Sequence, residues 1–297
     1  MRHLAAQLVV DTGLVRSALG VWVWAAMLRR DVLSAAYHIF HFVQFFDGAR
    51  AQWWKSARLE FNVMAGLIMG MFADTGAPLA PCVFATDAQG HDDGDDWGGY
   101  GIVGTPVTED YAQMLFARGT KPGRNVAKLD GSLGLKHASY LTPTVPFSRL
   151  PDSLFHHRRH WTVLGSGRWR FGDHITLGEG RAVFKLFATL AAHSGSHRSK
   201  VLSLQDNMPT AYAWARGRSS SIAVNYILRR KTAHCIGSEI TAVLPWVETS
   251  KQPADDASRG KDALWSEEDG PASVGPGYGD NGFQVQEGSP AFRRVAH

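Results

Sequence analysis

The stretch CVFATDA, at residues 82–88, decides the predicted fold, because it is a short β-rich run that ends in an aspartate. A second strand is predicted in WGGYGIVG, at residues 97–104, after an acidic loop. The run HWTVLGSGRWRF, at residues 160–171, predicts a third strand. Short apolar runs bounded by Gly and Asp are typical of strands. We expect these three leading strands to form an antiparallel meander.

Beyond residue 171, the apolar spacing predicts helices that alternate with strands. GEGRAVFKLFATLAAH, at residues 178–193, predicts an amphipathic helix, and KVLSLQDN, at residues 200–207, predicts a buried strand that ends in a helix N-cap pair. The remaining predicted elements are helices at 209–216 and 219–234, a strand at 238–248 and a short helix that opens in 253–259. Because helical crossovers join strands in parallel, the expected fold class is α/β, with a mixed five-stranded sheet flanked by helices.

The chain of 297 residues divides into three segments by composition. Residues 1–79 predict a helical segment, since apolar residues recur there at helical spacings. Its aromatic residues are expected to pack between those helices: Trp22, Trp24, Phe40, Phe42, Phe45 and Phe46. Residues 80–260 hold the α/β domain, with an irregular insertion at about 105–160. Residues 261–297 are rich in Gly, Pro, Ser and acidic residues, which predicts a disordered tail.

Composition argues against a membrane or secreted protein. The chain is 44% hydrophobic and 20% charged, as globular proteins are. No uncharged apolar stretch reaches the ~20 residues that a membrane-spanning helix needs. Asp11 and Arg16 interrupt the apolar run that a signal peptide requires. The two cysteines, Cys82 and Cys235, are expected to be reduced, buried thiols. We therefore expect no membrane partner and an intracellular location, cytoplasmic or nuclear.

Charge is unevenly distributed along the chain. Residues 81–117 carry 7 Asp and Glu and no Lys or Arg, whereas residues 118–235 carry 19 Lys and Arg against 5 Asp and Glu. A basic block beside an acidic cluster indicates polyanion binding next to a carboxylate site, because Lys and Arg neutralise phosphates and clustered carboxylates hold divalent cations. A solvated basic surface is the alternative.

Four carboxylates stand at the ends of predicted elements: Asp87, Glu179, Asp206 and Asp255. The first and fourth strands are expected to be neighbours, so these acids can converge at one edge of the sheet. Acids that lie close together repel one another, and divalent cations resolve that conflict. Two Mg²⁺ ions about 3.5–4 Å apart can activate a water molecule and stabilise the leaving oxygen of a phosphodiester. Taken alone, Asp206 with Asn207 is more often a helix cap than a metal ligand. Glu179 and Asp255 are each compatible with a helix start, and Asp87 with a turn at the end of a strand.

The motifs FATDAQG, WGGYGIV, HITLGEGRA, LSLQDN and QPADDASR occur in this order between residues 84 and 259. Together they resemble the successive motifs of the RNase H domain of retroelement reverse transcriptases of the DIRS-like type. The resemblance covers about residues 80–260, and the preceding segment resembles the thumb and connection of that family. It implies an RNase H-like fold, an RNA–DNA hybrid as substrate, and two Mg²⁺ ions, or Mn²⁺, held by the same four acids as catalytic residues.

The sequence also departs from that family. Gly178 replaces the leucine expected before Glu179, which should weaken entry into the helix by up to ~1 kcal/mol. Asp256 adjoins Asp255, and the A-D-x-x-S-R spacing favours Asp255 as the ligand. No polymerase Y-x-D-D motif is present. We therefore expect a fragment of a reverse transcriptase polyprotein that lacks the polymerase palm, with the polymerase part as a partner.

Basic residues near the acids suggest how a nucleic acid would be bound. The predicted contacts are Arg168, Arg170, Arg216, Arg218 and Asn207, and an RNA–DNA hybrid would be read by shape and 2′-hydroxyls. Two other functions remain open at this stage. One is a catalytically inactive relic that acts as a nucleic-acid-binding or structural module. The other is a DNA-strand nuclease or integrase of the same superfamily.

Overall fold

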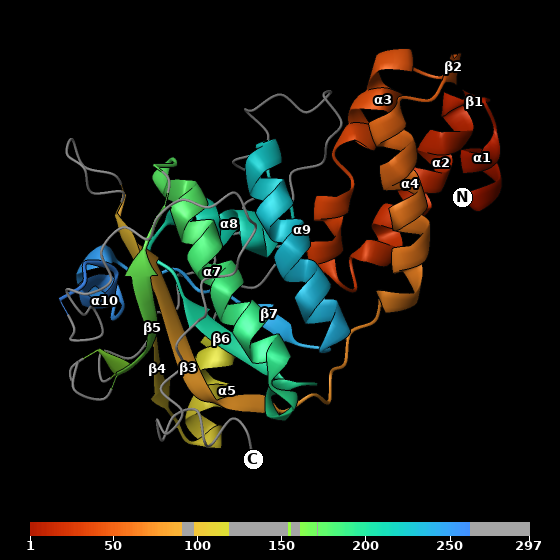
Figure 1. Cartoon of the computed structure of the whole chain (residues 1–297). Coiled ribbons are helices and arrows are strands. Elements are labelled where there is room, and N and C mark those ends of the chain that lie inside the picture. The colour runs from red at the N-terminus through yellow and green to blue at the C-terminus, as the bar shows by residue number, and fades with distance from the viewer. Residues whose placement is uncertain (91–97, 119–153, 156–160, 171, 262–297) are drawn as a thin grey trace, which may run out of the picture.

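The computed structural model describes residues 1–90, 98–118, 154–155, 161–170 and 172–261 (Figure 1). The predictions for the insertion beyond residue 118, apart from residues 154–155, and for the tail beyond residue 261 concern residues outside these ranges. Within the described residues, no helix is long and apolar enough to cross a membrane.

A mixed five-stranded sheet forms the centre of the larger part of the molecule. Its strands are β3 (Leu79–Ala88), β4 (Gly99–Pro106), β5 (Thr162–Arg168), β6 (Lys200–Leu204) and β7 (Thr241–Val243). Their order across the sheet is β5-β4-β3-β6-β7. The first three strands pair antiparallel, whereas β6 is parallel to both β3 and β7. The predicted meander followed by parallel additions is therefore confirmed.

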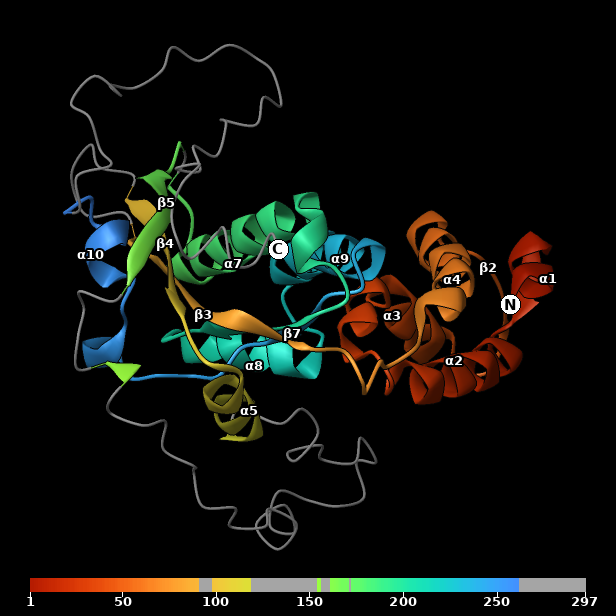
Figure 2. The same cartoon turned by 90° about the horizontal axis from the view of Figure 1, so that it is seen from below.

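Helices cover both faces of the sheet (Figure 2). On one face lie α7 (Ile175–Ala192) and α9 (Ile222–Gly237). Their apolar side chains, together with those of α8 (Met208–Arg216), share a core with Cys82 and Phe84 of β3. On the other lie α5 (Glu109–Arg118) and α10 (Asp255–Ser258), which share a core with Val83 and Ala85. Because successive side chains of a strand point to opposite faces, the apolar run of β3 supplies both cores.

Several predicted boundaries differ from the structure. Residues 109–118, expected to be irregular, form helix α5. Helix α7 begins at Ile175, three residues before the predicted start, because His174 caps it and its ring accepts a hydrogen bond from the Thr176 amide at 3.3 Å. The fifth strand is confined to Thr241–Val243, followed by a single parallel bridge between Gln205 and Trp246.

The N-terminal segment is mainly helical, as predicted, and has its own core. It comprises α1 (Arg2–Ala6), α2 (Thr12–Ala26), α3 (His38–Phe46) and α4 (Lys55–Leu67), with 3-10 turns at Arg30–Ala35 (η1) and Ile68–Gly70 (η2). Two short antiparallel strands, β1 (Val9–Asp11) and β2 (Arg50–Gln52), were not predicted.

The aromatic residues of this segment divide between its core and its surface. Trp22 and Phe42 are fully buried, as expected. Trp24 is 79% exposed and Phe45 71% exposed, so the prediction that they pack in the core is wrong. The core is formed by other residues of these two helices, among them Leu19 of α2 and Ile39 of α3.

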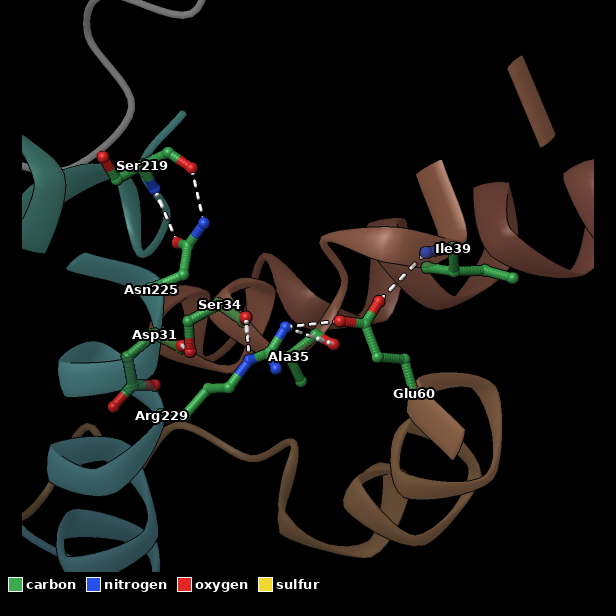
Figure 3. A network of polar contacts seen from close by, with 8 residues as sticks. All are labelled: Asp31, Ser34, Ala35, Ile39, Glu60, Ser219, Asn225 and Arg229. Carbon is green, nitrogen blue, oxygen red and sulfur yellow. Dashed lines mark hydrogen bonds and ion pairs between the residues drawn. The ribbon is translucent and has the colours of Figure 1, made fainter. Parts of the chain in front are cut away.

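The N-terminal helices are joined to the sheet domain through α9 (Figures 1 and 3). The Nε of Arg229 donates a hydrogen bond of 2.7 Å to the Ser34 carbonyl of η1. Its Nη2 forms an ion pair with Glu60 of α4, whose other oxygen accepts a 2.9 Å hydrogen bond from the Ile39 amide. Asp31 of η1 lies 3.7 Å from the ammonium of Lys231. Buried polar contacts therefore fix the two parts of the described chain to one another.

Candidate metal centre

Two of the predicted acids meet because β3 and β6 are parallel neighbours. Asp87 is the penultimate residue of β3, and Asp206 follows β6 after the bridge residue Gln205. The register pairs Ala85 with Leu204, so the two aspartates leave the sheet at the same edge. This neighbour relation was predicted from the order of the elements, and the structure confirms it.

Glu179 joins them from α7, on the face of the sheet that this helix covers. Each of the three acids, Asp87, Glu179 and Asp206, offers one carboxylate oxygen, and these atoms all lie within 4.8 Å of one another. Asp87 and Glu179 are buried, whereas Asp206 is half-buried. Glu179 stands in the second turn of α7, because the helix begins earlier than expected.

Burial and the charges of neighbouring acids raise the pKa of two members of this cluster, Asp87 and Glu179. Burial raises the pKa of Asp87 to about 6; the Ser258 hydroxyl opposes this shift, and the charges of Asp206 and Asp255 add to it. The pKa of Glu179 is raised well above its ordinary value, first by burial and then by the charges of Asp87 and Asp206. Carboxyl groups that lie this close together cannot all ionise without a compensating positive charge.

The cluster has the donor set that a hard divalent cation requires. Among the described residues, the buried oxygen Oε2 of Glu179 has no hydrogen-bond partner, although a buried carboxylate oxygen is costly to leave unpaired. Carboxylate oxygens are the ligands that Mg²⁺ and Mn²⁺ prefer. The residues present therefore fit a divalent ion held by Asp87, Glu179 and Asp206.

Asp255, the fourth predicted acid, lies beside the cluster and not within it. It is the first residue of α10, as predicted, and its charge raises the pKa of Asp87. Its Oδ1 accepts a 2.8 Å hydrogen bond from the Nε of Arg259. The neighbouring Asp256 lies 3.6 Å from the ammonium of Lys261. Asp255 is thus the acid of this pair that acts on Asp87, whereas its role as a ligand stays a prediction.

The predicted nucleic-acid contacts fall into separate groups. Arg168 and Arg170 are exposed at the end of the edge strand β5 and just beyond it. Arg216 and Arg218 are exposed at the far end of α8, and the Arg218 guanidinium lies 5.9 Å from the ring of Phe40 in the N-terminal part. Asn207 caps α8, with its side-chain oxygen accepting a 3.0 Å hydrogen bond from the Thr210 amide. The structure does not bring these five residues together.

Several residues around the cluster were not singled out as site residues. The Ser258 hydroxyl donates a hydrogen bond to Oδ2 of Asp87. The side-chain amide of Gln252 donates to the Thr86 carbonyl at 3.1 Å, and the side-chain amide of Gln205 also donates to Thr86. Ser258 belongs to the quoted A-D-x-x-S-R spacing, so the sequence contained a signal for it. Nothing in the sequence pattern indicated that either glutamine would reach Thr86.

Comparison with known proteins gives no match: neither a protein-family model, nor a curated protein, nor a solved structure matches this chain. The acidic cluster and the sequence motifs are therefore the features that indicate a function for this chain.

Proposed function

We propose that this protein is an RNase H-like nuclease that hydrolyses the RNA strand of RNA–DNA hybrids with two divalent metal ions. The observation that carries the proposal is the buried cluster of Asp87, Glu179 and Asp206 at one edge of the sheet. The strand order β5-β4-β3-β6-β7, with the first three strands antiparallel, is the arrangement that the motif order predicts.

The chain's own residues supply the binding site and its electrostatics. Asp87, Glu179 and Asp206 would hold Mg²⁺ or Mn²⁺, and Asp255 would complete the coordination when it leaves Arg259. Two such ions, when bound, activate a water molecule and stabilise the leaving oxygen of a phosphodiester. Metal binding requires ionised carboxylates, so the protons that burial retains on Asp87 and Glu179 must leave on binding. Asp206 is half-buried, so this side of the cluster is open to the solvent, from which a substrate would approach.

The hybrid substrate is inferred from the resemblance to retroelement RNases H. Under this proposal, the protein is related to retrotransposon reverse transcriptases, and a polymerase is a partner. The exposed Arg168 and Arg170 at the β5 edge and Arg216 and Arg218 beyond α8 are candidates for contacts with separate phosphates. An A-form-like hybrid is recognised through its backbone and 2′-hydroxyls and not through its base sequence.

Hydrolysis of an end-labelled RNA–DNA hybrid with Mg²⁺ or Mn²⁺ tests the proposal, with DNA duplex and single-stranded RNA as comparison substrates. Asp87→Asn and Asp206→Asn should each abolish metal-dependent cleavage of the RNA strand. Asp47→Asn is the matched control, because this aspartate is exposed and pairs only with Arg16 among the described residues. Cleavage that survives both site substitutions would exclude this site.

The same assay separates the alternative, a catalytically inactive module that binds nucleic acid. In that case the wild-type protein would bind the hybrid in a gel-shift or anisotropy measurement but would not cleave it. Binding would also be insensitive to Asp87→Asn and Asp206→Asn. Preferential cleavage of the DNA duplex would instead support a DNA-strand nuclease of the same superfamily.

A further inference from the structure

Helix α10 approaches the sheet most closely at Gly101 of β4. Gly101 is the residue that the antiparallel register places opposite Asp87. A Cβ atom at this position would lie 2.6 Å from the Ser258 amide nitrogen and 2.7 Å from the Ala254 carbonyl oxygen. Both are backbone atoms and cannot rotate away. The absence of a side chain at residue 101 is therefore what allows the backbone of α10 to lie directly beside Asp87.

This close approach places a buried hydroxyl on a member of the acidic cluster. Ser258 is 0% exposed, and its hydroxyl donates a hydrogen bond to Oδ2 of Asp87. The same Oγ lies within hydrogen-bond distance, 2.9 Å, of the Asp255 carbonyl oxygen. One hydroxyl thus connects the carboxylate of Asp87 with the backbone of the residue that carries the fourth acid.

The segment that carries Ser258 is attached to β3 at a second point. Gln252, 1% exposed, donates its side-chain amide to the carbonyl of Thr86, the residue before Asp87, at 3.1 Å. Two buried hydrogen bonds therefore fix residues 252–258 to consecutive residues of β3. A hydroxyl held this firmly restricts the orientation of the carboxylate that accepts from it.

We propose that Ser258 is a positioning residue of the metal centre, which orients the carboxylate of Asp87 for metal binding, and that Gly101 is the residue that lets it do so. This inference rests on the proposed metal binding by Asp87, Glu179 and Asp206. Ser258 touches neither metal nor substrate under this proposal. Groups that hydrogen-bond to a metal ligand fix its orientation, and their loss typically weakens metal binding 10–100-fold.

Isothermal titration of the full chain with Mn²⁺ tests the proposal, because it measures the Kd without relying on activity. Ser258→Ala should raise the Mn²⁺ Kd roughly tenfold or more. Ser203→Ala is the matched control: Ser203 is also 0% exposed, it lies on β6 close to Asp206 in the sequence, and its hydroxyl has no partner among the described residues. This control should leave the Kd within about twofold of wild type.

Gly101→Ala provides a second route to the same result without removing a polar group. The added methyl group must push α10 away from β4, so the Mn²⁺ Kd should again rise roughly tenfold. In a cleavage assay, both variants should raise the Mn²⁺ concentration that gives half-maximal rate while the KM for the hybrid changes less than twofold. If Ser258 only stabilised the fold, its loss would not change the Mn²⁺ requirement while leaving the KM for the hybrid nearly unchanged.

The outcomes separate the two proposals. If wild type binds Mn²⁺ and Ser258→Ala has an unchanged Kd, the positioning role is wrong and the metal centre stands. If Ser258→Ala and Ser203→Ala weaken binding equally, the effect is one of packing and the positioning role is also wrong. If wild type neither binds Mn²⁺ nor cleaves the hybrid, the proposed function fails, and the role of Ser258 fails with it.

Discussion

Glu60 of α4 and Arg229 of α9 form an ion pair that joins the N-terminal helices to the sheet domain (Figure 3). The Glu60 side chain is 6% exposed and that of Arg229 32% exposed, so the acid is the more deeply buried partner. Each partner also bonds to the backbone of the N-terminal part, Glu60 to the Ile39 amide and Arg229 to the Ser34 carbonyl. The pair is thus the centre of a junction and not an isolated surface contact.

Arg229→Met should destabilise the protein by about 2–3 kcal/mol, because it leaves the carboxylate of Glu60 buried without its cation. The partial exposure of Arg229 keeps the expected loss below that for a fully buried pair. Arg16→Met is the control, since Arg16 and Asp47 form an ion pair whose side chains are 52% and 82% exposed. Arg16→Met should lower the free energy of unfolding by less than about 1 kcal/mol. Urea denaturation measures both, and equal losses would contradict the prediction.

Asp87→Asn should stabilise the metal-free protein, and increasingly so as the pH rises. The pKa of Asp87 is about 6 in the folded protein, against roughly 3.9 in an unfolded chain. The folded state therefore binds the proton more tightly, and its free energy of unfolding decreases as the pH rises from about 4 to about 6. Asp87→Asn has no such proton to lose. The difference in free energy of unfolding between variant and wild type should therefore grow by up to about 3 kcal/mol between about pH 4 and about pH 6. Denaturation at pH 4, 5, 6 and 7 in EDTA measures it, and a constant difference would refute it.

Mn²⁺ should raise the melting temperature of wild type and leave that of Glu179→Gln almost unchanged. A ligand at 100 times its Kd stabilises the folded state by about 2.7 kcal/mol. Because binding needs ionised carboxylates, the shift should shrink as the pH falls below about 6, where Asp87 takes up its proton. Thermal melts with and without Mn²⁺ at pH 5 and pH 7.5 test this. A shift of equal size in Glu179→Gln would mean that the ion binds elsewhere.

Gly178→Ala should stabilise the protein by up to about 1 kcal/mol, because alanine is the better helix former and Gly178 lies inside α7. A Cβ there would make ordinary contacts, 3.4 Å from the Ala88 Cβ and 3.5 Å from the Trp169 indole nitrogen. Leucine, which the family pattern expects, would have to displace the Trp169 ring. Gly178→Leu should therefore destabilise. Gly20→Ala is the control, since a Cβ at residue 20 of α2 meets nothing within 4 Å. A stabilising leucine would show that this space is not filled by Trp169.

Cys82 and Cys235 should not react with a thiol reagent at pH 8 until the protein unfolds. Both are free and buried, and burial raises the pKa of Cys82 to about 12 and that of Cys235 to about 11. Only the thiolate is nucleophilic, and almost none is present at pH 8. Titration with an aromatic disulfide should find two thiols in denaturant and none in the native protein. Rapid labelling of the native protein would contradict the burial of these side chains.

The sheet and its acids could be predicted because they depend on local signals. The apolar run of β3 and the Asp-Asn that follows β6 are visible in the sequence, and the rules for crossovers place these two strands side by side. Asp87 and Asp206 therefore meet as expected. Glu179 joins them as expected, although the helix that carries it begins earlier, at Ile175. His174 caps this helix, and histidine is not a usual N-cap residue, so the sequence gives no clear signal for this start.

The remaining features depend on contacts between distant parts of the chain. The ion pair of Glu60 with Arg229 joins residues that lie 169 positions apart in the sequence, and no local signal indicates it. The pairing of β1 with β2 joins strands of three residues each, too short for a clear alternation of apolar and polar residues. The hydrogen bond from Ser258 to Asp87 requires the close approach at Gly101, which only the packed structure reveals.

The parallel pairing of β3 with β6 has a consequence for synthesis of the protein on the ribosome. β3 can form a hairpin with β4 as soon as both have emerged, but its other edge must wait until Lys200–Leu204 has been translated. During that interval an apolar strand presents unpaired amide and carbonyl groups, which is the condition under which nascent chains associate with one another. We expect this chain to need a chaperone while it is being made, and to be recovered in soluble form more readily when translation is slowed by low temperature.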